Sequence, residues 1–333
     1  MSIQFLEKGK GGSGTLTRGD TAELWTFIND IRGLVYNVGQ QLKQIFITRR
    51  HLDVEVKSKG QIVTIANRLT NELILSHLKQ RYPYIPILSE EGPSEEQTNR
   101  PGSNIESSID SHSGSTPVAR GVGGSEDSVQ AASQAQGGST VTLLWVVDPL
   151  DGTTNFAMHN AFWNISVSLM DIDTGQVLVG VVYAPMYEKM YYSGRGIGAF
   201  VNGKRLRLSK VDRDFSKGFH AFCYGNGDEA KERAASYYRY MLAQGYQCRQ
   251  LGAAQLELAY LAEGIIDTMF IASANVYDVA AGVLLVREAG GVVHNEHGTD
   301  WGYVSGSSVN QDVVAARNIE NVQTLHSILH EKL

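Results

Sequence analysis

Two carboxylates near the middle of the chain have the types and the spacing to hold a cation. Asp148 and Asp151 lie three residues apart within the segment WVVDPLDGTTNF at residues 145–156. The apolar run over 143–147 predicts a buried strand that ends at Pro149. In open α/β sheets, ligand sites lie at such strand ends. The alternative is a strand-to-turn cap, in which Asp and Gly only satisfy the turn geometry.

Oxygen atoms beside these two acids favour the first interpretation. The Leu150 carbonyl lies between the carboxylates, and the Thr153 hydroxyl follows them. A set made only of oxygen donors suits a hard divalent cation such as Mg2+, which prefers octahedral oxygen ligands. The motif therefore predicts a metal site.

Acidic residues also lie at the ends of other predicted elements. Glu90 and Glu91 follow a short strand predicted over 85–88, and by themselves they are typical of a solvated turn. Asp278 opens a helix predicted over 278–289, where the N–H groups of the first turn favour a negative charge. Alone, it is typical of an N-cap. Together with the central motif, these acids become candidate ligands of one cation site.

Composition and charge bound the class of protein. The 333 residues carry a formal net charge of -6 and are 42% hydrophobic, which allows a large core and argues against a nucleic-acid or anionic-membrane binder. The two cysteines, Cys223 and Cys248, provide no disulfide framework and fit a reducing compartment. Neither a signal-peptide pattern nor a membrane-spanning apolar run is present, so we expect a soluble, cytoplasmic protein.

Low-complexity segments divide the chain. Residues 1–19 are rich in glycine and predict a flexible tail. Residues 93–140 consist largely of Ser, Gly, Gln and Glu and contain scarcely an aromatic or large aliphatic residue. Such a stretch cannot bury enough apolar surface to offset its ordering entropy, so we expect a disordered insertion in a folded domain over 20–333.

Periodicity predicts a mixture of helices and strands without internal repeats. Apolar residues recur at helical spacing over 24–46, after a capping-box pattern at Asp20 and Glu23. Alternation over 163–169 predicts the first strand of an antiparallel meander. Other predicted helices cover 65–80 and 255–263, and other predicted strands cover 177–183, 189–193, 199–201 and 266–271, with a hairpin turn at Asn202-Gly203. These elements imply a layered α/β or α+β scaffold.

Three motifs occur in an order that is similar to a known family. They are SEEG at 89–92, WVVDPLDGTTNF at 145–156, and YDVAAG at 277–282 followed by EAGG at 288–291. With them the chain resembles the inositol monophosphatase family of lithium-sensitive, Mg2+-dependent phosphatases. The resemblance covers residues 20–320 outside the insertion. It implies a homodimer and the layered α-β-α-β-α sugar phosphatase fold, in an inositol monophosphatase-like domain over 20–333.

The resemblance also implies roles for individual residues. Two or three Mg2+ ions would be held by Glu90, Asp148, the Leu150 carbonyl, Asp151 and Asp278. One ion would activate a water as the nucleophile, and another would stabilise the leaving oxygen. Backbone N–H groups near Gly152 and Thr153 would cradle the phosphate. Catalytic roles are implied for Thr153, Asn67 and Glu90, of which Thr153 would orient the water. Contacts with the substrate or its phosphate are implied for Gly152, Thr153, Ile271 and Asp278.

One departure from the family pattern concerns Asn67. The family has an aspartate in a Val-Thr-x-Ala-Asp motif, where this chain has VTIAN at 63–67. The amide can accept a hydrogen bond from the Thr153 hydroxyl, but it cannot take a proton. Because general-base assistance contributes about 100- to 10,000-fold, two hypotheses stay open. The complete set of metal ligands favours an active Mg2+-dependent phosphomonoesterase; the alternative is a catalytically impaired pseudophosphatase that binds metal and a phosphorylated ligand.

A second departure concerns the substrate. The acidic residue that contacts inositol hydroxyls in the family is Ile271 here, and an aliphatic side chain cannot hydrogen-bond a hydroxyl. We therefore expect a small phosphorylated metabolite, an inositol monophosphate-like polyol or a sugar phosphate. Histidinol phosphate and a nucleotide 3'-phosphate are the alternatives. Thr154-Asn155 argues against the nucleotide, because nucleotide phosphatases of the superfamily usually have Lys-Glu there.

Overall fold

The computed structural model describes most of the chain outside the long insertion. It covers residues 2–6, 13–17, 21–48, 54–58, 61–92, 142–209, 214–303 and 310–331. The insertion predicted to be disordered, 93–140, lies outside the described residues. Within the segment for which we expected a flexible tail, 1–19, the described residues form the antiparallel strands β1 (Ser2–Leu6) and β2 (Ser13–Thr17).

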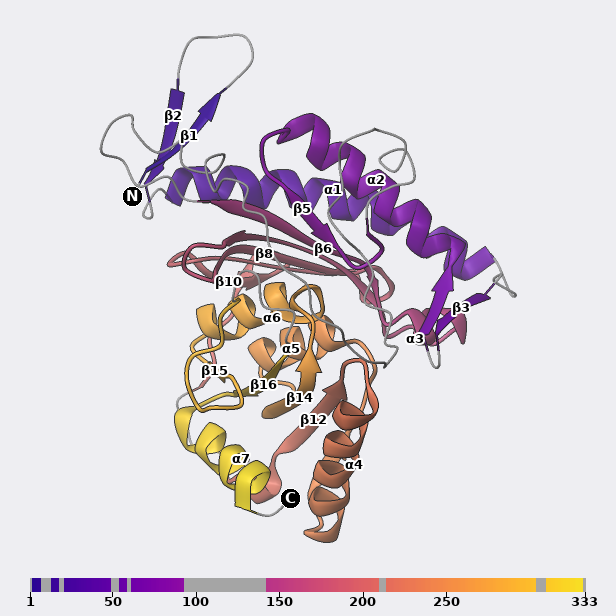
Figure 1. The fold of residues 1–333 in the computed structure, drawn as a ribbon, viewed down its shortest axis with the longest axis vertical. Helices are drawn as coiled ribbons and strands as arrows, with labels where there is room; N and C mark the ends of the chain where they lie inside the picture. Colours follow the sequence, from indigo (N-terminus) through magenta and orange to yellow (C-terminus); the bar gives the residue numbers. More distant parts are fainter. Residues whose placement is uncertain are drawn as a thin grey trace, which may run out of the picture.

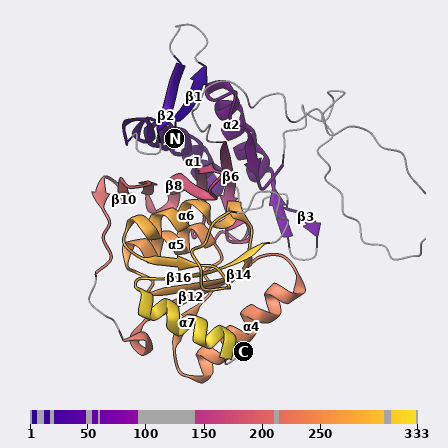
Figure 2. The same cartoon turned by 60° about the vertical axis from the view of Figure 1, so that its left-hand side comes forward.

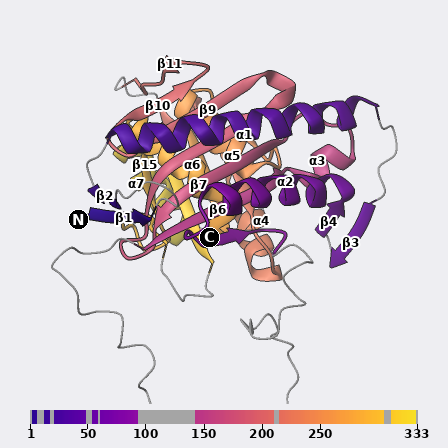
Figure 3. The ribbon, with the colours of Figure 1, turned by 90° about the horizontal axis from the view of Figure 1, so that it is seen from above.

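The elements stack in alternating layers of helix and sheet, which confirms the predicted fold (Figures 1 and 2). Helices α1 (Thr21–Thr48) and α2 (Ile65–Arg81) cover one face of the larger sheet, and α1 lies across its strands (Figure 3). Between the two sheets lie α5 (Ala254–Glu263) and α6 (Val276–Glu288). The outer face of the smaller sheet carries α4 (Asp228–Ala243) and α7 (Ile319–Glu331).

The larger sheet has the strand order β11-β10-β9-β8-β7-β6-β5 and is antiparallel except for the β5–β6 pair. Most of it is the meander expected from the alternating pattern. The Asn202-Gly203 turn between β10 and β11 has positive φ at both residues, as a tight hairpin requires. The strands are β5 (Ile87–Ser89), β6 (Leu143–Asp151), β7 (Asn164–Asp171), β8 (Gln176–Ala184), β9 (Lys189–Gly194), β10 (Gly198–Val201) and β11 (Lys204–Arg205).

The smaller sheet has the order β13-β12-β14-β16-β15, in which β12 runs parallel to both β13 and β14. Of its strands, only β14 was predicted with bounds, over 266–271. Their bounds are β12 (Phe219–Tyr224), β13 (Gln247–Arg249), β14 (Thr268–Ala274), β15 (Val292–His294) and β16 (Gln311–Ala316). The remaining described elements are β3 (Val54–Ser58), β4 (Gln61–Thr64), the short helix α3 (Thr153–Ala157), and 3-10 turns at Pro185–Tyr187 and Phe215–Lys217.

Strand β7 is buried along its whole length, on both faces. Its apolar residues, such as Val167 and Leu169, pack with the α1 and α2 layer, while its polar residues Ser166 and Ser168 are also buried. An alternating pattern is typical of a sheet with one solvated face. Here α5 and α6 cover the second face, so the alternation predicted the strand correctly without revealing the extra layer.

The predicted end of the central strand was wrong. Strand β6 continues past Pro149 to Asp151 and stays paired with β7 at both Asp148 and Asp151. Three residues of β6 span the distance that two residues of β7 span, so β6 contains a bulge. A bulge tolerates proline because a local ladder hydrogen bond is already missing there.

None of the described helices is long and apolar enough to cross a membrane.

Candidate active site

The predicted site residues gather around one cavity of about 920 Å3. Its walls come from the ends of β5, β6, β12 and β14, the start of α4 and α6, and the turn before α5. Asn67 does not line the cavity but contacts a residue that does. The predicted residues that line it are Glu90, Asp148, Leu150, Asp151, Gly152, Thr153, Ile271 and Asp278.

Parallel pairing of β5 with β6 brings Glu90 to the central motif. The Glu90 N–H donates to the Val147 carbonyl at 3.2 Å, which continues the ladder one residue past β5. The Glu90 and Asp148 carboxyl groups then share a hydrogen bond. The Leu150 N–H donates to Asp148 Oδ1 at 3.1 Å, so the bulge supplies one donor to this pair.

Asp151 joins the larger sheet to the helix layer below it. Its Oδ2 accepts hydrogen bonds from Asn164 Nδ2 at 2.6 Å and from the Gln255 N–H at 2.9 Å, and its Oδ1 accepts one from the Ala254 N–H at 3.2 Å. The last two donors belong to the first turn of α5, where N–H groups lack partners within the helix. The site carboxylate therefore also caps a helix.

Asp278 comes from α6, but its place in the helix differs from the prediction. The helix begins at Val276, so Asp278 lies in the first turn and Asn275 is the N-cap residue. Asp278 Oδ2 accepts hydrogen bonds from the Asn275 N–H at 3.2 Å and from Asn275 Nδ2 at 2.9 Å. This is a capping box, which holds the carboxylate at the cavity.

Burial raises the pKa of each of the four acids, and repulsion from neighbouring carboxylates adds to the rise for Glu90, Asp148 and Asp151. Burial, together with the charges of Asp278 and Glu91, raises the pKa of Glu90 to about 8. Burial also raises the pKa of Asp151 to about 7 and that of Asp278 to about 6, although their amide donors oppose the shift. Burial and the charge of Glu90 hold the pKa of Asp148 well above its usual range. The site thus concentrates negative charge that a cation would neutralise.

The oxygen donors match a hard cation in chemistry, but they do not converge on a single point. Within the described ranges, no three His, Cys, Asp or Glu side chains are close enough together to form a metal site. Asp151 is instead satisfied by amide donors. The donor set, its burial and its like charges are therefore the features that fit an ion.

Asn67 contacts Thr153 as predicted, but in the opposite sense. Asn67 Nδ2 donates to Thr153 Oγ1 at 3.1 Å and to Glu91 Oε1 at 3.3 Å. A carboxylate only accepts hydrogen bonds, so Glu91 orients the NH2 end of the amide toward both partners. The Thr153 hydroxyl donates to the Leu150 carbonyl at 2.9 Å. The prediction that the Asn67 oxygen accepts the Thr153 proton was wrong, because that proton goes to the main chain.

Gly152 forms a left-handed turn between β6 and α3. Its φ is 85°, and a Cβ atom at this position would lie 2.9 Å from the Phe162 carbonyl oxygen. Both the conformation and the close approach require glycine. The turn therefore exposes its backbone to the cavity beside Thr153.

Several cavity residues were missed by sequence reasoning. Tyr224 comes from β12, Asn226 from the loop after it, and Lys231 from α4. No bounds were predicted for either element. These residues form no motif in the sequence. Parallel pairing of β12 with β14 places Cys223 opposite Ile271, and the segment that follows β12 then lines the same cavity. The capping partner Asn275 was also missed, although an Asn three residues before an Asp is a recognisable helix start.

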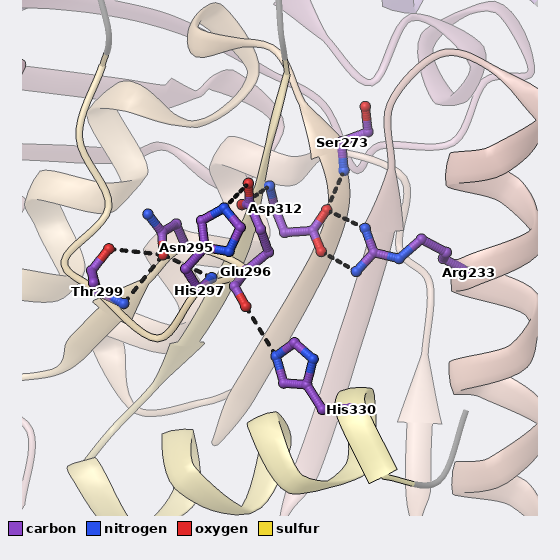
Figure 4. A network of polar contacts seen from close by, with 8 residues as sticks. All are labelled: Arg233, Ser273, Asn295, Glu296, His297, Thr299, Asp312 and His330. Atoms are coloured by element: carbon purple, nitrogen blue, oxygen red, sulfur yellow. Dashed lines mark hydrogen bonds and ion pairs between the residues drawn. The ribbon is translucent and has the colours of Figure 1, made fainter.

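A polar network on the far side of β14 supports the segment that leads to Asp278 (Figure 4). The Arg233 guanidinium on α4 pairs with the Asp312 carboxylate, with 2.9 Å between Nη1 and Oδ1. The same Oδ1 accepts the Ser273 N–H at 2.9 Å, and the Asp312 N–H donates to Glu296 Oε2 at 3.0 Å. Asp312 is only 3% exposed, so the network is buried at its centre.

The network holds Ser273 in a left-handed conformation, with φ of 56°. This residue lies in the irregular part of β14 between Ile271 and Ala274, just before the α6 cap. Its carbonyl oxygen would lie 2.0 Å from a Cβ on Gly225, so only glycine fits opposite it. Asp312 therefore helps to set the direction in which the chain leaves the smaller sheet toward Asp278.

Comparisons with known proteins show which family the chain resembles over most of its length. The model of the inositol monophosphatase family matches residues 25–333. An inositol-1-monophosphatase of Mesorhizobium japonicum is 31% identical over 265 residues, which cover 78% of this chain and 82% of that protein. The Nus factor SuhB of Escherichia coli is 40% identical over 159 residues, or 47% of this chain and 58% of that protein.

A solved structure has the same fold. The extragenic suppressor protein suhB of Bartonella henselae superimposes with a TM-score of 0.70 and 24% sequence identity, covering 92% of this chain and 100% of that one. At this identity the likeness concerns the fold alone.

The raised carboxyl pKa values make a prediction for the protein without divalent cations. The folded state binds more protons than the unfolded chain between about pH 4 and pH 8, so the free energy of unfolding should fall as the pH rises through that window. Asp148→Asn removes one of the repelling charges and should raise that free energy by about 1 to 3 kcal/mol at pH 8, with the gain vanishing toward pH 4. Urea denaturation in EDTA measures both effects. The exposed Asp214→Asn is the control, and a loss of stability in Asp148→Asn at pH 8 would contradict the prediction.

The Asp312 network makes a second prediction. Asp312→Asn leaves Arg233 without its partner and should lower the free energy of unfolding by about 1 to 3 kcal/mol. Ser273→Gly should raise it by about 1 kcal/mol, because glycine adopts positive φ without strain. In the double variant, the cost of Asp312→Asn should be smaller than in the wild type, because the turn no longer needs to be held. Denaturation of the four proteins tests this coupling, and strictly additive effects would refute it.

Proposed function

The chain belongs to the inositol monophosphatase family, and from this premise we propose that it is a Mg2+-dependent phosphomonoesterase of a small phosphorylated metabolite. The reaction would be hydrolysis by a metal-activated water. The observation that carries the proposal is the cavity that joins four carboxylates to the Thr153 hydroxyl and the Gly152 turn. A turn cap alone does not account for four buried acids around one cavity.

The residues that would hold Mg2+ are Glu90, Asp148, the Leu150 carbonyl, Asp151 and Asp278. They supply only oxygen, and their raised pKa values reflect a charge that an ion would offset. Bound there, two or three ions would supply an activated water and charge stabilisation of the leaving oxygen. The acids must lose any bound protons when the metal enters, so apparent Mg2+ affinity is expected to rise with pH.

The protein itself would orient the water and the phosphate. Because the Thr153 proton is donated to Leu150, the hydroxyl presents a lone pair to a water rather than a proton. Asn67 fixes that hydroxyl from the other side. The left-handed Gly152 turn allows the phosphate to approach backbone N–H groups that no side chain covers.

Asn67 favours one second candidate, a catalytically impaired pseudophosphatase. The hydrogen bonds of Thr153 lead to an amide and a carbonyl, and neither accepts a proton at neutral pH. The water would then lose its proton without a protein base behind Thr153. Such a protein would bind metal and a phosphorylated ligand with little turnover.

Asn67→Asp distinguishes the two candidates. We expect the wild type to release phosphate in a Mg2+-dependent manner and the variant to raise kcat about tenfold or more, because a carboxylate can accept the Thr153 proton. The measurement is phosphate release from inositol 1-phosphate, sugar phosphates, histidinol phosphate and a nucleotide 3'-phosphate, with Mg2+ titrated. Asn67→Ala is the matched control and should lower kcat, because Thr153 loses a partner. Activity in the variant but none in the wild type would establish the pseudophosphatase.

The substrate and the setting of the enzyme belong to the same proposal. An inositol monophosphate-like polyol or a sugar phosphate fits the family and the named Mesorhizobium relative. Histidinol phosphate and a nucleotide 3'-phosphate stay alternatives. The homodimer and the lithium sensitivity are predictions from the family resemblance, and the cytoplasmic location is a prediction from the composition of the chain. Sedimentation of the purified protein and inhibition by LiCl test the first two.

A further inference from the structure

Lys231 carries the only positive charge among the described residues that line the cavity. It lies in the first turns of α4, on the wall formed by the β12 end and the loop after it. The carboxylates come from other elements, namely the β5 and β6 ends and α6. Acidic and basic groups thus enter the same cavity from different layers of the fold.

The ion pair that Lys231 forms with a neighbouring residue is weak. Its nearest acidic partner is Asp228, at 3.6 Å between Nζ and Oδ1, and the Asp228 side chain is fully exposed at 104%. Such a pair on the surface contributes little and holds the ammonium loosely. Lys231 is itself 47% exposed, so the amine is free to move toward a ligand in the cavity.

The part of the cavity wall where Cys223 of β12 lies opposite Ile271 of β14 offers few partners to hydroxyl groups. Cys223 and Ile271 face each other in the register of β12 and β14, are 6% and 2% exposed, and both line the cavity. The Cys223 thiol donates to Glu257 Oε2 at 2.7 Å, so its hydrogen is already used. A neutral polyol placed here would bury hydroxyls against aliphatic and thiol groups, which costs affinity.

The size of the cavity leaves room for more than the reacting phosphate. A volume of about 920 Å3 lies at the upper end of the range for small-molecule sites. An anionic group on the alcohol half would be repelled by the acids unless a cation lay near it. Lys231 is placed to supply that cation.

We propose that Lys231 determines specificity, and that the preferred phosphate monoester carries a second anionic group, a carboxylate or another phosphate, on its alcohol half. This inference rests on the proposed phosphatase function and narrows its substrate class. Lys231 would form a charge-assisted hydrogen bond with the second anion, while the reacting phosphate lies at the acidic end. Ile271 and Cys223 would contact the carbon skeleton between them.

Two matched substrate pairs test the proposal. 3-Phosphoglycerate differs from glycerol 3-phosphate by a carboxylate, and fructose 1,6-bisphosphate differs from fructose 1-phosphate by a second phosphate. In at least one pair, we expect the member with the second anionic group to have the higher kcat/KM with Mg2+. The pair that shows this preference identifies the anion as a carboxylate or a phosphate. In Lys231→Met, the ratio of the two kcat/KM values should fall about tenfold, mainly through KM. Lys231→Arg should keep most of the preference.

The matched control is Lys217→Met, at an exposed lysine of the 3-10 turn outside the cavity. It should leave the ratio at the wild-type value. A ratio near one in the wild type, or a ratio that Lys231→Met does not change, overturns the inference while the phosphatase function stands.

Failure of the proposed function is a separate result. If no ester is hydrolysed, calorimetric titration of the same pairs with Mg2+ present decides the inference by binding. Tighter binding of the member with the second anionic group, lost in Lys231→Met, supports the inference. Equal affinities of the two members in the wild type overturn it.

Discussion

The structure depends on the concentration of four carboxylates in one buried site. Glu90, Asp148, Asp151 and Asp278 repel one another, and their removal from water adds to the cost. Asp148, Asp151 and Asp278 are held by N–H donors from different parts of the fold: the β6 bulge, the first turn of α5 and the cap of α6. Glu90 is hydrogen-bonded to Asp148. The layers of the fold are therefore arranged so that several element ends meet at one point.

This arrangement explains why unusual backbone conformations surround the site. The bulge in β6, the left-handed Gly152 and the left-handed Ser273 each redirect the chain at the end of a strand. Ser273 is not glycine, and the Arg233–Asp312 pair holds it in place from behind. Strained residues of this kind persist where the surrounding structure fixes them, and they gather at functional sites. Part of the stability of the smaller sheet is thus committed to the geometry of the cavity.

Asn67 and Lys231 mark where this chain differs in chemistry from the pattern its carboxylates suggest. Asn67 keeps the contact to Thr153, and Glu91 turns its NH2 end toward that hydroxyl. As an amide, Asn67 cannot accept a proton as a carboxylate would. Lys231 adds a positive charge to a cavity otherwise lined by acids and neutral groups. In the proposed function, metal binding, proton transfer and substrate choice would therefore rest on separate residues, and each could change without loss of the others.

The sequence by itself determined the central acidic motif, the meander and most of the described helices, because these depend on short-range periodicity and on residue types only a few positions apart. The resemblance to the family then placed Glu90 and Asp278 in one site with the central acids Asp148 and Asp151. Only the tertiary structure decided that β6 continues through Pro149, since the bulge exists by pairing with β7. The direction of the Asn67 hydrogen bond likewise depends on Glu91, 24 residues away, and Lys231 of α4 lines the cavity together with carboxylates from distant elements. Such contacts join distant segments, and no local pattern in the chain records them.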